Sequence, residues 1–176
     1  ALARLRGGNL EGARLAADAA WKRMDDTPTS FEVLYGYIGV IEVYLELWLR
    51  AVIKHSKDAV SLGRRAKGAC ECIKRYASLF PVGTALVHLY EGRLASDHGE
   101  SKAGRKCLEK GLEESRRMSL PYFEGLVLYE WILCPAVPEY QTRTYFRLAR
   151  EVFWRIGSEY YTERLDSYRQ AQASVR

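Results

Sequence analysis

Residues that bind metal ions or form disulfides are scarce in this sequence, and they are scattered. Among 176 residues there are 3 histidines and 4 cysteines. No His-x3-His or Cys-x2-Cys pair occurs, although these spacings are the ones that hold zinc in helices and short loops. The cysteines also lack the spacing of a disulfide framework. We therefore expect no metal ion, no cofactor and no disulfide, with reduced thiols in a cytoplasmic protein.

Sequence motifs of nucleophilic and nucleotide-binding enzymes are also absent. There is no Gly-x-Ser-x-Gly elbow, which would present a catalytic serine. The segment Gly99–Lys106 has two glycines and two lysines, but a phosphate-binding loop needs a lysine directly after the second glycine, followed by serine or threonine. Here Arg105 and Lys106 follow Gly104. We therefore expect no catalytic residues and a chain that is not an enzyme.

Long uncharged runs and clusters of a single charge sign are missing as well. The longest apolar stretch runs from Val33 to Leu49 and contains Glu42 and Glu46, whereas a membrane span needs about 20 apolar residues with almost no charge. The net charge is +5, but the basic clusters are interrupted by acidic residues such as Glu71 and Glu109. A nucleic-acid interface concentrates one sign on one face. The sequence therefore predicts neither a membrane segment nor a nucleic-acid partner.

Helix signals, by contrast, occur throughout the chain. The motif Thr29-Ser30-Phe31-Glu32 has the form of a capping box, Ser101 can cap a helix, Pro121 suits a first turn, and Gly99 suits a C-terminal cap. No segment alternates polar and apolar residues between hairpin turns. We therefore predict an all-α fold. The expected helices cover residues 2–5, 11–22, 30–53, 61–79, 84–96, 101–118, 121–133, 140–156 and 158–173.

Small residues recur at helical spacing in four of these expected helices. Steps of four and then three or four residues place the members of each set on one helix face, where a small first member lets a neighbouring helix approach closely. The first members lie roughly 35 to 55 residues apart, the length of a helical-pair repeat. The sets are Ala13-Ala17-Ala20, Ala66-Cys70-Ile73, Ala103-Cys107-Gly111 and Ala149-Phe153-Ile156.

This recurrence predicts one helical-repeat segment over residues 1–176, built from stacked antiparallel helix pairs. The approximate units are 1–28, 29–82, 83–120 and 121–157, with a terminal helix at 158–176. Because the chain opens inside a repeat-like stretch, we expect it to be part of a longer protein.

The sets resemble the tetratricopeptide repeat, whose second helix carries a small residue, an aromatic residue four positions later and a small residue three beyond. The sets that start at Ala13 and Ala149 match best, while cysteine takes the aromatic position in the other two. The segments Gly8–Ala13 and His98–Ala103 resemble the turn between the two helices of a unit. The resemblance implies a right-handed α-solenoid, a tetratricopeptide-like superhelix that binds a protein or peptide.

A narrower resemblance is found in two longer segments. Residues Arg75–Gly83 and Leu148–Gly157 are similar to the C-terminal repeat tails of large signalling proteins, in which class III nucleotide cyclase or LuxR-type output domains are joined to an ATPase core. This resemblance implies a regulatory region whose cyclase or ATPase domains lie outside the present chain.

Candidate binding residues form two groups, the first on the expected helix at 30–53. Glu42, Glu46 and Arg50 follow at four-residue steps, and Tyr35 and Gly39 extend the same stripe. One interpretation is a polar groove lining that receives a peptide. The other is an exposed strip in which Glu46 and Arg50 form a helix ion pair worth a few tenths of a kcal/mol.

The second group consists of aromatic residues in the C-terminal half. Most aromatics at helical spacing belong to a core, but Tyr129 and Tyr161 have polar tips and could serve as anchors on a binding surface. The group comprises Tyr122, Phe123, Tyr129, Trp131, Tyr160 and Tyr161.

The leading hypothesis is a non-catalytic protein–protein interaction or scaffold module, and thus a regulatory repeat region of a larger signalling protein. Its partner would be a protein, a peptide or another domain of the same parent chain, and an incomplete stack would also self-associate. A regulatory tail of a cyclase or ATPase is one alternative. A small helical ligand-binding bundle or enzyme is another, and a single deep apolar pocket would favour it.

Overall fold

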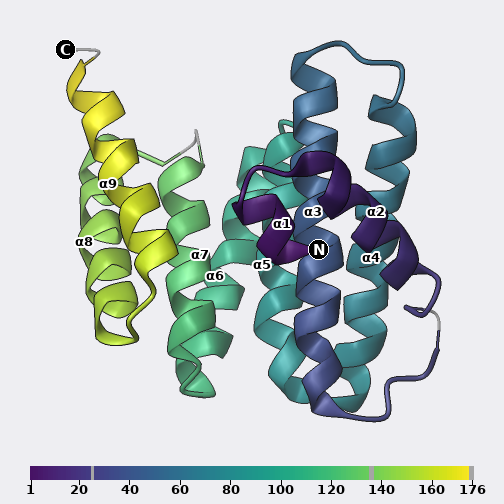
Figure 1. The fold of residues 1–176 in the computed structure, drawn as a ribbon. Helices are drawn as coiled ribbons and strands as arrows, with labels where there is room; N and C mark the ends of the chain where they lie inside the picture. Colours follow the sequence, from purple (N-terminus) through teal and green to yellow (C-terminus); the bar gives the residue numbers. More distant parts are fainter. Residues whose placement is uncertain (25, 135–136, 175–176) are drawn as a thin grey trace. The chain divides into compact units, whose positions relative to one another are not determined.

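The computed structural model describes residues 1–24, 26–134 and 137–174, and all regular secondary structure in these ranges is helical (Figure 1). The predicted all-α class is therefore confirmed. Two 3-10 turns, Phe31–Val33 and Pro81–Gly83, precede α3 and α5. The helices are α1 (Leu2–Arg6), α2 (Leu10–Trp21), α3 (Leu34–Ile53), α4 (Ala59–Leu79), α5 (Thr84–Asp97), α6 (Ser101–Arg117), α7 (Pro121–Leu133), α8 (Glu139–Arg155) and α9 (Glu159–Ser174).

Local sequence chemistry explains where several helices begin and end. The Ser30 hydroxyl accepts a hydrogen bond from the Glu32 amide at 3.1 Å and so caps the 3-10 turn that leads into α3. Val33, at the cap position of α3 itself, makes no side-chain cap bond. Gly99 has a φ of +82° after α5, a conformation that glycine adopts without strain. The prediction that Ser101 caps α6 is wrong, because Ser101 is the first residue of the helix and Glu100 occupies the cap position without a side-chain bond.

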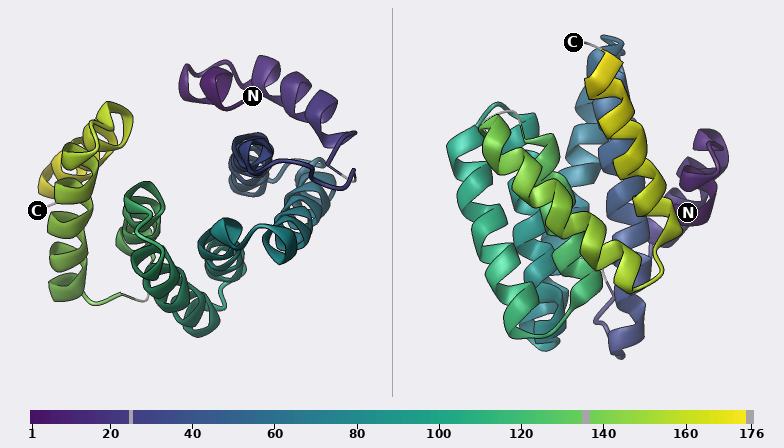
Figure 2. Two further views of the ribbon diagram at one scale, coloured as in Figure 1. Left: turned by 90° about the horizontal axis from the view of Figure 1, so that it is seen from below. Right: turned by 90° about the vertical axis from the view of Figure 1, so that its left-hand side faces the viewer.

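The chain divides into two compact units, Ala1–Gly83 and Thr84–Arg176, which are called unit 1 and unit 2 below. Within unit 1, α3 packs on α4, α2 and α1. Within unit 2, the helices from α5 to α8 each pack on the next helix in the sequence, and α9 packs on α8 (Figure 2). Helices that follow one another in the sequence are thus packed in adjacent pairs inside each unit.

Helix α3 is the buried centre of unit 1, although it contains two glutamates. Its apolar side chains point to most sides and are covered by α1, α2 and α4, and burying each stabilises the fold by about 1.5 to 3 kcal/mol. The Tyr44 hydroxyl donates a 2.6 Å hydrogen bond to Asp18 of α2. Trp21 packs edge-on against the Tyr44 ring, with 5.8 Å between centroids. These contacts fix α2 on α3.

Three of the four small-residue sets begin on buried positions, as their spacing predicts. Ala13, Ala66 and Ala149 are all completely buried. So is Phe153, the second member of the last set. The small side chains allow α2, α4 and α8 to lie close to their neighbours.

For the set that starts at Ala103, the predicted buried position is wrong by one residue. Ala103 is exposed, whereas the next residue, Gly104, is buried. A Cβ atom at Gly104 would lie 2.9 Å from the carbonyl oxygen of Gly92 in α5, and it would collide with the Ser96 hydroxyl. The backbones of α5 and α6 therefore meet at these glycines, and this contact sets the register. The buried positions of α6 are Gly104, Leu108, Gly111 and Ser115.

Candidate functional site

The polar stripe predicted on α3 is present but is not a continuous exposed row. Glu46 accepts an ion-paired hydrogen bond from Arg50, with 2.6 Å between Oε1 and Nε. Tyr35 is 70% exposed, whereas Glu42 is partly buried. Helix α1 lies against the stripe at Gly39, where a Cβ atom would be 3.6 Å from that of Leu2. The ion pair between Glu46 and Arg50 is the one that the exposed-strip interpretation of this stripe predicts.

Tyr129 and Tyr161 are brought together in unit 2, but both are buried, with 7% and 8% exposure. Their rings pack edge to face with 5.5 Å between centroids, and Tyr161 also stacks on Phe153 at 4.8 Å. Arg164 of α9 donates from Nε to the Tyr129 hydroxyl at 2.9 Å and from Nη1 to the Tyr160 hydroxyl at 2.9 Å. This cluster holds α9 against α7 and α8.

Burial raises the pKa of the Tyr129 phenol above its usual value, even though Arg164 lies beside it. The hydroxyl therefore stays protonated at neutral pH and accepts the arginine bond through its oxygen. Hydrogen bonds to charged groups are stronger than those between neutral groups. The contact between Tyr129 and Arg164 is thus an important link between α7 and α9.

Tyr129→Phe is expected to lower the free energy of unfolding by about 1–2 kcal/mol, because Arg164 loses its acceptor on α7. Urea unfolding followed by far-UV circular dichroism measures this loss. The matched control is Tyr160→Phe, which removes the more exposed partner of the same arginine and should change stability by less than about 0.5 kcal/mol. Equal effects of the two substitutions would contradict the role assigned to Tyr129.

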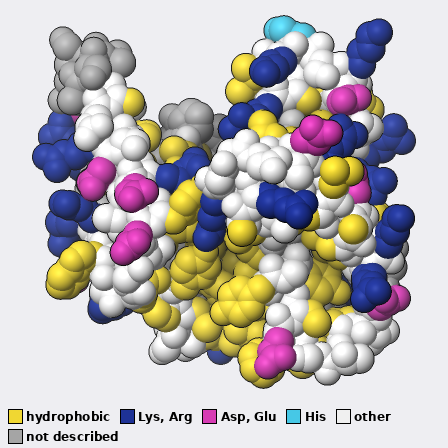
Figure 3. All heavy atoms as spheres, viewed as in Figure 1, with side chains coloured by type: hydrophobic (Ala, Val, Ile, Leu, Met, Phe, Trp, Pro, Cys, Tyr) yellow, Lys and Arg dark blue, Asp and Glu magenta, His cyan; other side chains and the backbone are white. Residues whose placement is uncertain are grey.

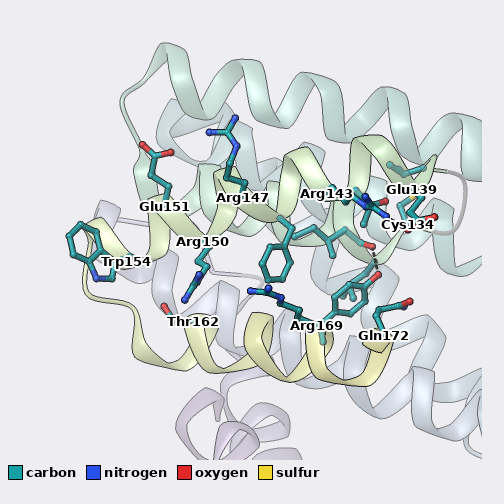
Figure 4. A pocket seen from close by; sticks show the side chains of 16 residues that line it. Cys134, Glu139, Arg143, Arg147, Arg150, Glu151, Trp154, Thr162, Arg169 and Gln172 are labelled. Atoms are coloured by element: carbon teal, nitrogen blue, oxygen red, sulfur yellow. Dashed lines mark hydrogen bonds and ion pairs between the residues drawn. The ribbon is translucent and has the colours of Figure 1, made fainter. Parts of the chain in front are cut away.

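The described part of unit 2 contains an open cleft that the sequence did not predict (Figure 4). It lies between α8 and α9, and the C-terminal end of α7 forms its floor. Its volume of about 1390 Å³ exceeds the roughly 300–1,000 Å³ of a pocket for a small ligand. The two helices are joined near Gly157, where Phe153 stacks on Tyr161. The Tyr168 hydroxyl reaches the Ile132 carbonyl at 3.4 Å further along.

Arginines outnumber acidic residues in the lining of this cleft. Figure 3 shows basic side chains along α8 and α9, at the left-hand edge of the view. The Arg143 guanidinium lies 2.8 Å from Glu139, and that of Arg150 lies 3.8 Å from Asp166. Arg147 and Arg169 make no hydrogen bond or ion pair with any residue that the structure describes. The lining includes four arginines (Arg143, Arg147, Arg150, Arg169) and two glutamates (Glu139, Glu151).

An exposed tryptophan stands at one end of the same cleft. Trp154 is 78% exposed, whereas its neighbour Phe153 is completely buried. Phe146 also lines the cleft and is partly buried. Tryptophan and arginine are the residues most enriched at the energetic centres of protein interfaces. The cleft therefore combines aromatic surface with positive charge, which suits recognition better than bond-making chemistry.

Metal ligands are not gathered at this cleft or elsewhere in the described ranges. No group of three or more His, Cys, Asp and Glu side chains there could hold a metal ion. Likewise, none of the described helices has the length and apolar character needed to cross a bilayer. None of the four cysteines forms a disulfide bond with a described residue, and Cys70, Cys72 and Cys134 are buried.

Comparison with known proteins gave no match: neither a protein-family model, nor a curated protein, nor a solved structure matches this chain.

Proposed function

We propose that this chain is a non-catalytic helical-repeat module that binds a protein or peptide through the cleft between α8 and α9. The observation that carries the proposal is the open cleft with Trp154 exposed at its end. The packing of successive helices in adjacent pairs supports a repeat architecture. We further propose that the fold is a tetratricopeptide-like right-handed solenoid. The partners would include other domains of a parent cyclase or signalling ATPase.

The size and openness of the cleft favour a chain-like ligand over a small molecule. A small-molecule site buries most of its ligand in an enclosed space, whereas this cleft is open to solvent and runs along two helices (Figure 4). A peptide laid between α8 and α9 would contact the aromatic and aliphatic floor along its length. Cysteines that form no disulfide among the described residues support a reducing compartment, and we place the module in the cytoplasm.

Selection of 12-residue peptides from a random phage-displayed library is expected to yield peptides that bind the purified chain. Trp154→Ala should weaken such binding at least tenfold, because interface tryptophans often contribute 2 kcal/mol or more. Fluorescence anisotropy with a labelled, selected peptide measures the change. Tyr140→Ala is the matched control, because Tyr140 is an exposed aromatic residue of the same helix outside the cleft lining.

The same peptides also test the stripe on α3. The double substitution Glu42→Lys/Glu46→Lys should leave their binding unchanged if the cleft between α8 and α9 is the site. If no peptide is enriched by a folded protein, or if Trp154→Ala binds as tightly as Tyr140→Ala, the proposed function is wrong.

A further inference from the structure

Two arginines from different helices point into the space between α8 and α9. Figure 4 shows Arg150 on α8 and Arg169 on α9 directed toward this space, while Arg147 and Glu151 leave α8 on the side away from α9. Guanidinium groups bind carboxylates through two parallel hydrogen bonds. Two guanidinium groups carried by opposite walls of one cleft can thus hold a carboxylate-bearing chain between them.

Neither of these arginines is neutralised by a strong internal partner. Arg169 makes no ion pair or hydrogen bond with any described residue. Arg150 has Asp166 at 3.8 Å, and both side chains of that pair are about half exposed, at 51% and 45%. Exposed pairs of this kind contribute little to stability. A carboxylate arriving from outside can therefore bind both guanidinium groups without breaking a stabilising contact.

Apolar side chains lie beside the two arginines, and they determine which groups a ligand must carry besides its carboxylates. Ile132 and Leu133 from the end of α7 form the floor, and Phe146 and Trp154 of α8 line the cleft. A partner must therefore carry aliphatic or aromatic side chains close to its carboxylates. A nucleic-acid backbone fits less well, because nucleic-acid interfaces are polar and strongly basic, whereas apolar side chains make up much of this lining.

We propose that the cleft between α8 and α9 binds an extended acidic peptide segment, with carboxylates on Arg150 and Arg169 and apolar side chains on Phe146 and Trp154. This inference rests on the proposed function and adds the chemistry of the partner. Binding of this kind weakens with salt, because exposed charges are screened.

The test uses the full chain and a fluorescent pool of 12-residue peptides that alternate Asp or Glu with Leu, Phe or Trp. A matched pool carries Lys at every acidic position. The acidic pool is expected to bind, and the Lys pool is expected not to. The double substitution Arg150→Glu/Arg169→Glu should weaken binding of the acidic pool at least tenfold, because both anchoring charges are reversed.

The matched control is Lys106→Glu/Lys110→Glu on α6, where both lysines are exposed and lie outside the cleft lining. It changes the net charge of the chain by the same amount, so it separates a local effect from general electrostatic attraction. We expect it to change binding by less than about twofold at 0.15 M salt, where exposed charges more than about 8 Å apart are largely screened. Circular dichroism must show that both double variants keep the wild-type helical content and melting curve.

Three outcomes would overturn the acidic-partner proposal while leaving the binding module in place. The first is selection of tight-binding peptides without acidic residues. The second is equal weakening by the two charge reversals. The third is a self-associating chain whose dimer is lost in Arg150→Glu/Arg169→Glu, because the cleft would then receive a second copy.

Two further outcomes reach beyond the partner's chemistry. If single-stranded oligo(U) binds, is lost in Arg150→Glu/Arg169→Glu and is not displaced by the acidic pool, the ligand is a nucleic acid and the acidic-peptide proposal is wrong. If neither random nor acidic peptides bind the folded chain at all, the proposed function fails together with this inference.

Discussion

Gly104→Val is expected to lower the free energy of unfolding by about 3 kcal/mol, the upper part of the range for overpacked cores. The first added carbon would lie 2.9 Å from the Gly92 carbonyl oxygen and would collide with the Ser96 hydroxyl. A backbone oxygen cannot move aside as a flexible side chain can, so α5 and α6 must separate. The other side of the contact is equally tight, because a Cβ at Gly92 would lie 2.9 Å from Leu108.

The neighbouring substitution Ala103→Val is the matched control for this effect. Ala103 is exposed on the same helix, so valine there loses only helix propensity, about 0.5 kcal/mol. Urea unfolding followed by circular dichroism measures both variants. The pair also tests the register of α6, since the spacing of small residues in the sequence placed Ala103 at the helix contact. A larger loss from Ala103→Val than from Gly104→Val would show that the structure has this register wrong.

Phe153→Ala is expected to lower the free energy of unfolding by about 3–5 kcal/mol, the cost of emptying a well-packed aromatic site. Phe153 is completely buried and stacks on Tyr161 with 4.8 Å between ring centroids. It also fills the space above Gly125 of α7, where a Cβ atom would lie 2.6 Å from the ring. The ring therefore joins α7, α8 and α9, and thermal or urea unfolding should reveal its loss as a large drop in stability.

The adjacent residue provides the control and separates stability from binding. Trp154 is 78% exposed, so Trp154→Ala should change the free energy of unfolding by less than about 0.5 kcal/mol. The same substitution is expected to weaken peptide binding, whereas Phe153→Leu should mainly lower the free energy of unfolding. If Trp154→Ala destabilises the chain as much as Phe153→Ala does, the exposed position of the tryptophan is wrong.

The positions of the helices could be predicted because their ends depend on a few neighbouring residues. Capping groups, glycines and prolines act within one turn. Pro121 is the first residue of α7, and the capping motif around Ser30 lies one 3-10 turn before α3. The apolar stretch from Val33 to Leu49 is predicted as a helix because a capping-box motif precedes it, and its two glutamates argue against a membrane span. In the structure it begins with a 3-10 turn at Phe31–Val33.

The register of α6 could not be read reliably because two equivalent spacings occur side by side. Ala103, Cys107 and Gly111 follow the same steps as Gly104, Leu108 and Gly111. Only the partner helix decides between them, and Gly92 of α5 does so by allowing backbone contact at Gly104. The choice therefore depends on tertiary packing, which a pattern within one helix does not contain.

The candidate site shows the same division between local and tertiary information. Tyr129 and Tyr161 were proposed as surface anchors, but packing between α7, α8 and α9 buries both. Arg143, Arg147 and Arg150 are spaced for neighbouring positions on one helix, a signal that could have indicated a basic face. The cleft itself depends on the angle between α8 and α9 after the turn that joins them, and no residue pattern in the sequence predicts that angle.

Within each unit, every helix packs mainly on the helices that precede or follow it in the chain. Contacts between segments close in sequence require little loop closure, so they form early and quickly. A polypeptide arranged in this way can gain or lose a whole hairpin during evolution without rebuilding the rest. It can also begin to acquire its native helices while later segments are still being synthesised.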